Sequence, residues 1–383
     1  MVRFLFIFLL ASISNVCVGQ PKIIIDPNAR KTGDLSLNDI VESIEYIPLE
    51  TNNECLIGVV GELLVSENYI FISCKITRRY YLFTRNGKFV AYVGNIGQGP
   101  GEYAVNNINI VHINEKDDVV TLRTRHPQSL MYYNLKGKYI KSAPFEYGGI
   151  ALSNQNGYFL LKYPNFGTTP YSYALFDNDL KMITQQIKPV PYTREQQNFY
   201  AGRGTPFCQY LFNDNEYVRE NVLNDTLYRI NHDYSFTPAY IINAGKREVT
   251  VDLRRDSRLF EREAENYVIV TYMYETTDYL LLSYTYQSKG IHCYFNKYDN
   301  KLLHLPSQSG IPNDYDGGFD FWPKYQNNKE MFAVYDAYMF KEHQENQNKI
   351  KPLGQPKAIE NFNKLAQSID PDDNPVIVIV KMK

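Results

Sequence analysis

Short apolar runs rich in tyrosine, valine and isoleucine recur along the chain, and each is bounded by Gly, Asn or Asp. Two segments, Tyr81–Val90 and Met131–Ile140, align without a gap at a spacing of fifty residues. Each has the pattern of a strand, a turn in which lysine follows glycine, and a second strand. The pattern therefore predicts a β-hairpin that is repeated along the chain.

Three weaker copies of this hairpin follow, at residues Ala174–Ile183, Thr226–Phe236 and His292–Leu302. Their turns carry Asn and Asp, which tolerate the left-handed backbone of a tight turn. One more strand is expected before each hairpin, at Tyr69–Cys74, Val119–Leu122, Gly157–Tyr163, Tyr210–Tyr217 and Tyr279–Tyr284. The period of about 40 to 70 residues is that of a four-stranded propeller blade with its loops.

A sixth blade is deduced from the remaining β runs, at Phe332–Tyr338 and at the two chain ends. Val376–Val380 predicts a C-terminal strand and Ser43–Leu49 an N-terminal one. Propellers commonly pair their first and last strands in one blade, which removes a free edge. Apolar residues at helical spacing predict one inserted helix at Pro356–Ser368. The predicted fold is an all-β, six-bladed β-propeller over residues 20–383, with one short helical insertion near the C-terminus.

Composition and charge agree with this fold and exclude one class of partner. The chain has 383 residues, of which 44% are apolar, and this is enough to build a large core. The formal net charge is −2, so we expect no nucleic-acid partner. The 33 tyrosines suit sheet packing, and platforms on which sugars stack are the alternative.

Residues 1–19 have the pattern of an export signal. One positive charge at Arg3 precedes a short apolar run, and small residues lead to Gly19. That run is too short to span a bilayer, and no transmembrane span is expected elsewhere. A lipid anchor at Cys17 is the alternative, although Val16 replaces the small residue that precedes cysteine in lipoprotein signals. We expect export to the periplasm or the cell surface.

Four cysteines remain after the signal: Cys55, Cys74, Cys208 and Cys293. Their spacing does not match a zinc site. Disulfides can form in an exported protein, but Cys74 and Cys293 lie in strand-like runs where a buried thiol is equally compatible. The sequence leaves their pairing open.

The basic and glycine-rich segments offer candidate binding residues. Gly97–Glu102 lacks the Gly-Lys-Ser/Thr ending of a phosphate-binding loop, so we expect a tight crossing between blades. Glu102 is the residue of this crossing that could face the central channel. Arg79 and Arg123 lie in cationic pairs that could line a funnel for an anionic ligand, or could be solvated loop charges.

An acidic loop gives the candidate metal site. Asp314, Asp316 and Asp320 surround two glycines, and carboxylate oxygens are the ligands that Ca²⁺ prefers. Their spacing does not fit an EF-hand, and Asx turns are the alternative. Trp322 follows directly, either as a residue that stacks on a ligand or as a hydrophobic plug. The chain contains no G-x-S-x-G or HExxH motif.

Several segments resemble one protein family. Arg85–Tyr103 resembles a stretch of the exported six-bladed β-propellers, related to NHL-repeat propellers, that are abundant in anaerobic gut bacteria. Ile47–Thr51, Asn224–Tyr228 and Asn313–Pro323 are similar to recurring segments of that family and come in the same order. The resemblance implies a propeller of the cell envelope with no assigned reaction.

Two functions of different classes follow as hypotheses. The first is a non-catalytic binding module for a glycan, a peptide or an envelope protein. The second is a metal-dependent propeller hydrolase or lyase that acts on a small substrate in the central channel, for which Ca²⁺ is the expected cofactor. Only the analogy of fold and the acidic loop favour the second hypothesis.

Overall fold

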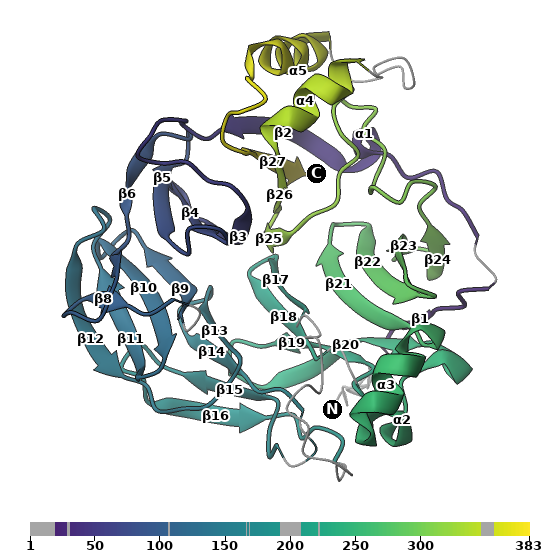
Figure 1. The fold of residues 1–383 in the computed structure, drawn as a ribbon. Coiled ribbons are helices and arrows are strands. Elements are labelled where there is room, and N and C mark those ends of the chain that lie inside the picture. Colours follow the sequence, from purple (N-terminus) through teal and green to yellow (C-terminus); the bar gives the residue numbers. More distant parts are fainter. Residues whose placement is uncertain are drawn as a thin grey trace, which may run out of the picture.

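The structure is a computed structural model that describes residues 20–28, 31–105, 108–165, 167, 169–191, 208–220, 223–345 and 356–383. The predicted export signal, with Cys17, lies outside these residues. Within the described residues, six sheets surround a central axis, which makes the protein a six-bladed β-propeller (Figure 1). Their innermost strands face that axis.

Blades 1, 2 and 3 are each built from four consecutive antiparallel strands. Blade 1 has β3 (Val60–Val65), β4 (Tyr69–Cys74), β5 (Tyr80–Thr84) and β6 (Phe89–Tyr92). Blade 2 has β9 (Ile108–Asn114), β10 (Val119–Arg125), β11 (Gln128–Tyr133) and β12 (Tyr139–Pro144). Blade 3 has β13 (Ala151–Asn154), β14 (Phe159–Lys162), β15 (Tyr173–Phe176) and β16 (Met182–Gln186). The short parallel strands β7 (Asn95–Ile96) and β8 (Glu102–Tyr103) connect blades 1 and 2.

Blades 4 and 5 continue this order. Blade 4 has β17 (Cys208–Phe212), β18 (Asn215–Arg219), β19 (Thr226–Ile230) and β20 (Phe236–Asn243). Blade 5 has β21 (Ile269–Glu275), β22 (Tyr279–Tyr286), β23 (Lys289–Asn296) and β24 (Lys301–His304). Between them lie the short helices η1 (Gly245–Arg247), α2 (Val251–Arg255), α3 (Ser257–Glu263) and η2 (Ala264–Asn266).

Blade 6 closes the ring with strands from both ends of the chain. Its order from the axis outward is β25 (Tyr325–Asn327), β26 (Glu330–Tyr335), β27 (Val376–Met382) and β2 (Val41–Pro48). The pairing of β2 with β27 joins the N-terminal region to the C-terminus. Helices α4 (Ala337–Glu345) and α5 (Pro356–Ser368) are inserted between β26 and β27 and lie outside the blade (Figure 1).

The residues before β2 form a strap along the outside of the ring. Strand β1 (Lys22–Ile24) pairs in parallel with β20 as a fifth strand of blade 4. Thr32 then forms a bridge with His304 of blade 5, and helix α1 (Leu37–Ile40) leads into blade 6. Because Ile23 and Ile25 are buried, the strap contributes to the core and links three blades.

The glycines of the two best-matched hairpins have a structural reason. Gly87 and Gly137 have left-handed φ angles of 85° and 73°. A Cβ at Gly87 would overlap the carbonyl oxygen of Pro48, and one at Gly137 would overlap that of Tyr92. In both cases this oxygen lies at the end of the outer strand of the preceding blade, so only glycine fits. Blade 3 has Leu180 at the equivalent place, with φ of 62°.

Two predicted strands run into another element in the structure. The run over 210–217 is not one strand, because Asn213 and Asp214 have left-handed φ angles of 48° and 58° and form the turn between β17 and β18. The strand expected over 332–338 ends at Tyr335, where α4 follows. Helix α5 has the predicted bounds, whereas α2, α3 and α4 were not predicted.

All four cysteines of the described chain are buried free thiols. Burial raises the pKa of Cys208 to about 11, and burial raises that of Cys293 as well. Cys208 and Cys293 therefore behave as small apolar side chains of the core. No helix among the described residues is long and apolar enough to cross a membrane.

Candidate ligand cavity beside blade 4

Glu102 and Arg79 lie apart in the structure, and each side chain contacts a neighbouring group of the protein. Glu102 is exposed and folds back on its own loop, where its carboxylate accepts a hydrogen bond of 2.9 Å from the Gly99 backbone N–H. The Arg79 guanidinium lies over the ring of Tyr92, 4.7 Å from its centroid. Such a contact stabilises a fold by roughly 0.5–1 kcal/mol at an exposed site.

Arg123 is buried and serves the joint between blades 2 and 3. Its Nη1 and Nη2 atoms donate to the backbone oxygens of Gly149 and Tyr147 at 3.2 and 2.8 Å. Burial is the main cause that lowers the pKa of Arg123, to about 10. The side chain therefore holds the connection into blade 3, with 1% of its surface exposed.

The three aspartates of the acidic loop point to different partners. Asp314 accepts a hydrogen bond from the Asn38 backbone N–H, and Asp320 accepts one from the Ser307 hydroxyl. Asp316 is buried and accepts from Tyr46, Asn313 and Gly318. Among the residues that the structure describes, no three His, Cys, Asp or Glu side chains form a group that could hold a metal ion. Calcium binding by this loop stays a prediction.

Trp322 packs against a histidine of blade 5. Its ring is stacked on His292 with a centroid distance of 3.9 Å, and its Nε1 atom is buried without a hydrogen-bond partner. Burial lowers the pKa of His292 to about 4, so this imidazole is neutral at pH 7. The sequence-predicted residues therefore have different surroundings, and the structure does not bring them together into one site.

One end of the central channel is crossed by the β17–β18 turn. The Asp214 backbone N–H donates to Asn328 of blade 6 at 2.9 Å, and the Asp214 carboxylate accepts from the same side chain at 3.1 Å. Asn156 of blade 3 donates to the Asp214 backbone oxygen at 3.4 Å. Blades 3 and 6 are not neighbours in the ring, so this turn reaches across the axis.

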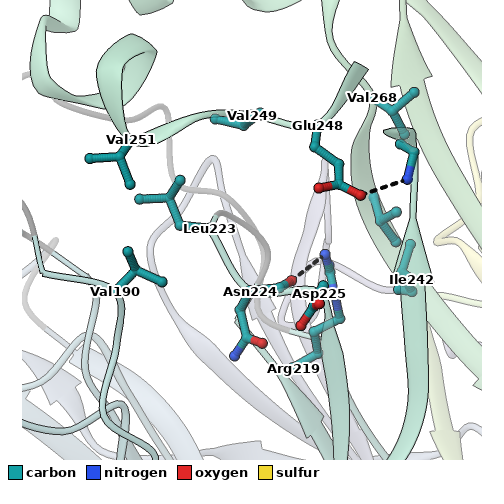
Figure 2. Close-up of a pocket in the computed structure, with 12 residues that line it drawn as sticks. Val190, Arg219, Leu223, Asn224, Asp225, Ile242, Glu248, Val249, Val251 and Val268 are labelled. Carbon is teal, nitrogen blue, oxygen red and sulfur yellow. Dashed lines mark hydrogen bonds between the residues drawn. The ribbon is translucent and has the colours of Figure 1, made fainter. Parts of the chain in front are cut away.

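A walled cavity lies beside blade 4, where the connection to blade 5 passes over it (Figure 2). Its volume is about 320 Å³. Most of the residues that line it are aliphatic and come from three parts of the chain: Val190 after blade 3, Leu223 and Ile242 of blade 4, and Val249, Val251, Val268 and Val270 around the helical insertion. Pockets of about 300–1,000 Å³ with apolar walls and few polar groups are typical small-molecule sites.

Three charged side chains of the cavity are hydrogen-bonded to residues close to them in the sequence. Arg219 donates through Nη2 to the Asn224 backbone oxygen at 2.8 Å, and Glu248 accepts from the Ala244 backbone N–H at 3.0 Å. Asp225 accepts from the Thr226 hydroxyl at 2.7 Å. Figure 2 shows these charged groups apart from Val190, Leu223 and Val251. Ile242 and Val268 lie on the same side as the charged groups, so the cavity combines aliphatic residues with two carboxylates and one guanidinium.

Burial shifts the pKa of Arg219, which lines this cavity, and of Glu220 next to it in the sequence. Burial lowers the pKa of Arg219, and the negative groups around it oppose that change. The adjacent Glu220 accepts hydrogen bonds from Asn165 and Ser172 of blade 3. Burial raises the pKa of Glu220 to about 7. This carboxylate therefore ties blade 4 to blade 3 and changes its charge near neutral pH.

Sequence reasoning missed this cavity because its lining comes from distant segments. Asn224 and Asp225 stand within a segment that resembles the propeller family, but the valines of the helical insertion have no pattern of their own. Only the fold brings them beside Arg219.

The chain belongs to a family of propellers without an assigned reaction. Residues 21–381 match the family described as a domain of unknown function, DUF4934, and the chain is a member of it. No curated protein matches the sequence. The fold and the family together define a six-bladed β-propeller of the DUF4934 family.

Two solved structures from Bacteroides are similar to this chain. One is a Bacteroides fragilis protein described as a candidate exported protein, with a TM-score of 0.66, 16% identity, and coverage of 95% of this chain and 99% of that chain. The other is a DUF4221 family member from Bacteroides vulgatus, with a TM-score of 0.49, 10% identity, and coverage of 90% and 97%. The similarity to the B. fragilis protein shows the fold alone.

Proposed function

We propose that this protein is an exported, non-catalytic binding module of the cell envelope, and that the cavity beside blade 4 holds part of its ligand. The observation that carries the proposal is the cavity itself, which joins an aliphatic wall to three fixed charged groups. Such a lining suits a ligand with an apolar end and a polar end, on a glycan, a peptide or a protein.

Export is supported by the pattern of residues 1–19 and by the description of the similar B. fragilis protein as a candidate exported protein. The choice between periplasm and cell surface belongs to this proposal as well. A rigid ring whose termini are locked together in one blade is a stable support for a binding site outside the cell.

The proposal is tested by filling the cavity. In Val251→Trp, a larger ring occupies the space between the helical insertion and blade 4. Ile76→Trp is the matched control, because Ile76 is 67% exposed on blade 1. Residues 20–383 of each variant are screened by thermal shift against monosaccharides, amino acids and short peptides.

We expect at least one compound to raise the melting temperature of the parent and of Ile76→Trp, and not of Val251→Trp. A bound ligand at 100 times its Kd stabilises the folded state by about 2.7 kcal/mol, which such a screen detects. The proposed site would be contradicted if every compound that stabilises the parent also stabilised Val251→Trp to the same extent.

A further inference from the structure

A row of polar side chains crosses the face of blade 2 that is turned toward blade 3. The strand register aligns His112 of β9 with Thr121 of β10, Thr121 with Tyr132 of β11, and Tyr132 with Lys141 of β12. Side chains of directly paired residues point to the same face of a sheet. Each of the four strands therefore contributes one polar group to this row.

The equivalent row of blade 1 is apolar. The register there aligns Leu64, Phe71, Leu82 and Ala91. Three of these positions precede Thr121, Tyr132 and Lys141 by fifty residues, which is the spacing of the hairpin repeat. Phe71 and Leu82 are fully buried and pack against blade 2, so the cleft between blades 1 and 2 is closed there.

The cleft between blades 2 and 3 contains a cavity at this row. Its volume is about 320 Å³, and all four side chains of the row line it. Asn154, Phe159 and Asn178 of blade 3 form the opposite wall. The polar row thus borders an open space where the repeat would place an apolar contact.

The contacts of Asn154 and His112 identify two hydrogen-bond acceptors at this cavity. Asn154 is buried, with 5% of its surface exposed, and its Oδ1 atom has no hydrogen-bond partner. His112 Nδ1 lies 2.5 Å from the Asn154 backbone oxygen. A carbonyl oxygen only accepts, so Nδ1 carries the proton, and Nε2 of the neutral ring is an acceptor. A buried amide oxygen without a partner costs free energy unless a ligand or water supplies a donor.

The rest of the lining favours an uncharged ligand with an apolar side. Lys141 and Asp117 are its charged residues, and their formal charges cancel. Burial is the main cause that lowers the pKa of His112, so the ring stays neutral at pH 7. Val119, Ile140 and Phe159 supply apolar surface.

We propose that the cleft between blades 2 and 3 binds a neutral polyhydroxyl ligand with the chemistry of a pyranose sugar. Its hydroxyl groups donate to Asn154 Oδ1 and to the His112 ring, and its apolar face packs on Val119, Ile140 and Phe159. This site is separate from the cavity beside blade 4 and does not rest on the function proposed for that cavity.

The test uses the methyl glycosides of glucose, galactose and mannose as probes, with residues 20–383 and saturation-transfer NMR followed by calorimetric titration. Asn154→Leu removes the amide at nearly constant size. His112→Leu and Tyr132→Leu make the row resemble that of blade 1. Ile76→Trp, at an exposed position of blade 1, is the control that keeps this cleft intact.

We expect at least one glycoside to bind, and its affinity to fall at least tenfold in Asn154→Leu and not in Ile76→Trp. We expect the melting temperature of Asn154→Leu to equal or exceed that of the parent, because a buried amide oxygen without a partner is removed and the hydrogen bond lost, from Nδ2 to Asn178, is long at 3.5 Å. Absence of binding by all three probes, or equal affinity in Asn154→Leu, would overturn the proposal. A lower melting temperature together with unchanged affinity would assign Asn154 a structural role only and would overturn it too.

Discussion

The clefts on the two sides of blade 2 occupy equivalent positions in the ring and differ in content. The cleft toward blade 1 is filled by Phe71 and Leu82, which are fully buried. The cleft toward blade 3 has Thr121 and Tyr132 at the matching positions and keeps a cavity of about 320 Å³. The hairpin repeat therefore fixes the backbone of a blade but not the face it presents to its neighbour. A departure from the repeat is the place to look for a site.

The largest expected effect comes from giving blade 1 the residue of blade 2. Phe71→Thr removes a fully buried ring and places a hydroxyl in an apolar cluster. We expect the free energy of unfolding to fall by about 3–5 kcal/mol, the range for loss of a buried aromatic ring. Urea unfolding followed by circular dichroism measures it.

Thr121→Val is the matched control in blade 2, where the side chain is also buried. We expect it to change the unfolding free energy by less than about 1.5 kcal/mol, the net contribution of one hydrogen-bonding hydroxyl. Equal losses of unfolding free energy in Phe71→Thr and Thr121→Val would show that the two clefts beside blade 2 are packed alike, and would contradict the difference between them.

Much of the fold could be predicted because the hairpins carry local signals. Strand β4 has the predicted bounds, as does helix α5, and the turns are marked by Gly, Asn and Asp. The inner strands were harder to find, because β13 and β17 are short and carry polar residues among apolar ones. The strap at β1 has only three residues, and its partner β20 lies more than two hundred residues away.

The sites could not be predicted, because each is assembled from separate blades. Arg123 looked like a residue of a funnel, yet its place in β10 directs it to backbone oxygens before blade 3. His112, Thr121 and Tyr132 become one row only through strand register. The spacing of fifty residues did contain a usable signal, since Phe71, Leu82 and Ala91 become Thr121, Tyr132 and Lys141. That substitution pattern is visible once the register is known.

The turns at the outer ends of the same two clefts can be compared in the same way. In Gly137→Ala, the alanine must adopt the left-handed φ of Gly137, and its Cβ overlaps the Tyr92 carbonyl oxygen of blade 1. We expect the unfolding free energy to fall by about 2–3 kcal/mol, because backbone strain of this kind costs about 1–3 kcal/mol and the overlap adds to it. Differential scanning calorimetry gives the change in melting temperature.

Leu180→Gly tests the equivalent turn at the cleft between blades 2 and 3. Leu180 already holds a left-handed φ and packs, partly buried, against the core cluster that includes Phe159 and Phe176. Glycine relieves a left-handed conformation that costs about 1–2 kcal/mol and gives up a partly exposed contact of similar size. We therefore expect a net change below about 1 kcal/mol, and a loss as large as that of Gly137→Ala would contradict a looser outer end.

The smallest effect is a dependence on pH that separates the two clefts. Burial lowers the pKa of His112 from its ordinary value of 6.5, so the folded state releases this proton more readily than the unfolded state. Between the folded pKa and pH 6.5 the unfolded state binds more protons, and stability rises with pH there. Across the other cleft, burial raises the pKa of Glu62, which accepts from Asn109 and Ile110, so its contribution has the opposite sign above about pH 4.5.

His112→Gln isolates the first contribution, because the amide can still donate to the Asn154 backbone oxygen but does not titrate. We expect the parent to lose stability relative to His112→Gln as pH falls below 6.5, and the two curves to run parallel above pH 7. Taking the difference between the curves cancels groups that the variant leaves in place, including Glu220 with its pKa of about 7 and His292 with its pKa of about 4. Urea unfolding at intervals from pH 4.5 to 8 supplies both curves. Parallel curves over the whole range would mean that His112 is solvated like a free imidazole, and the cleft between blades 2 and 3 would then not enclose it.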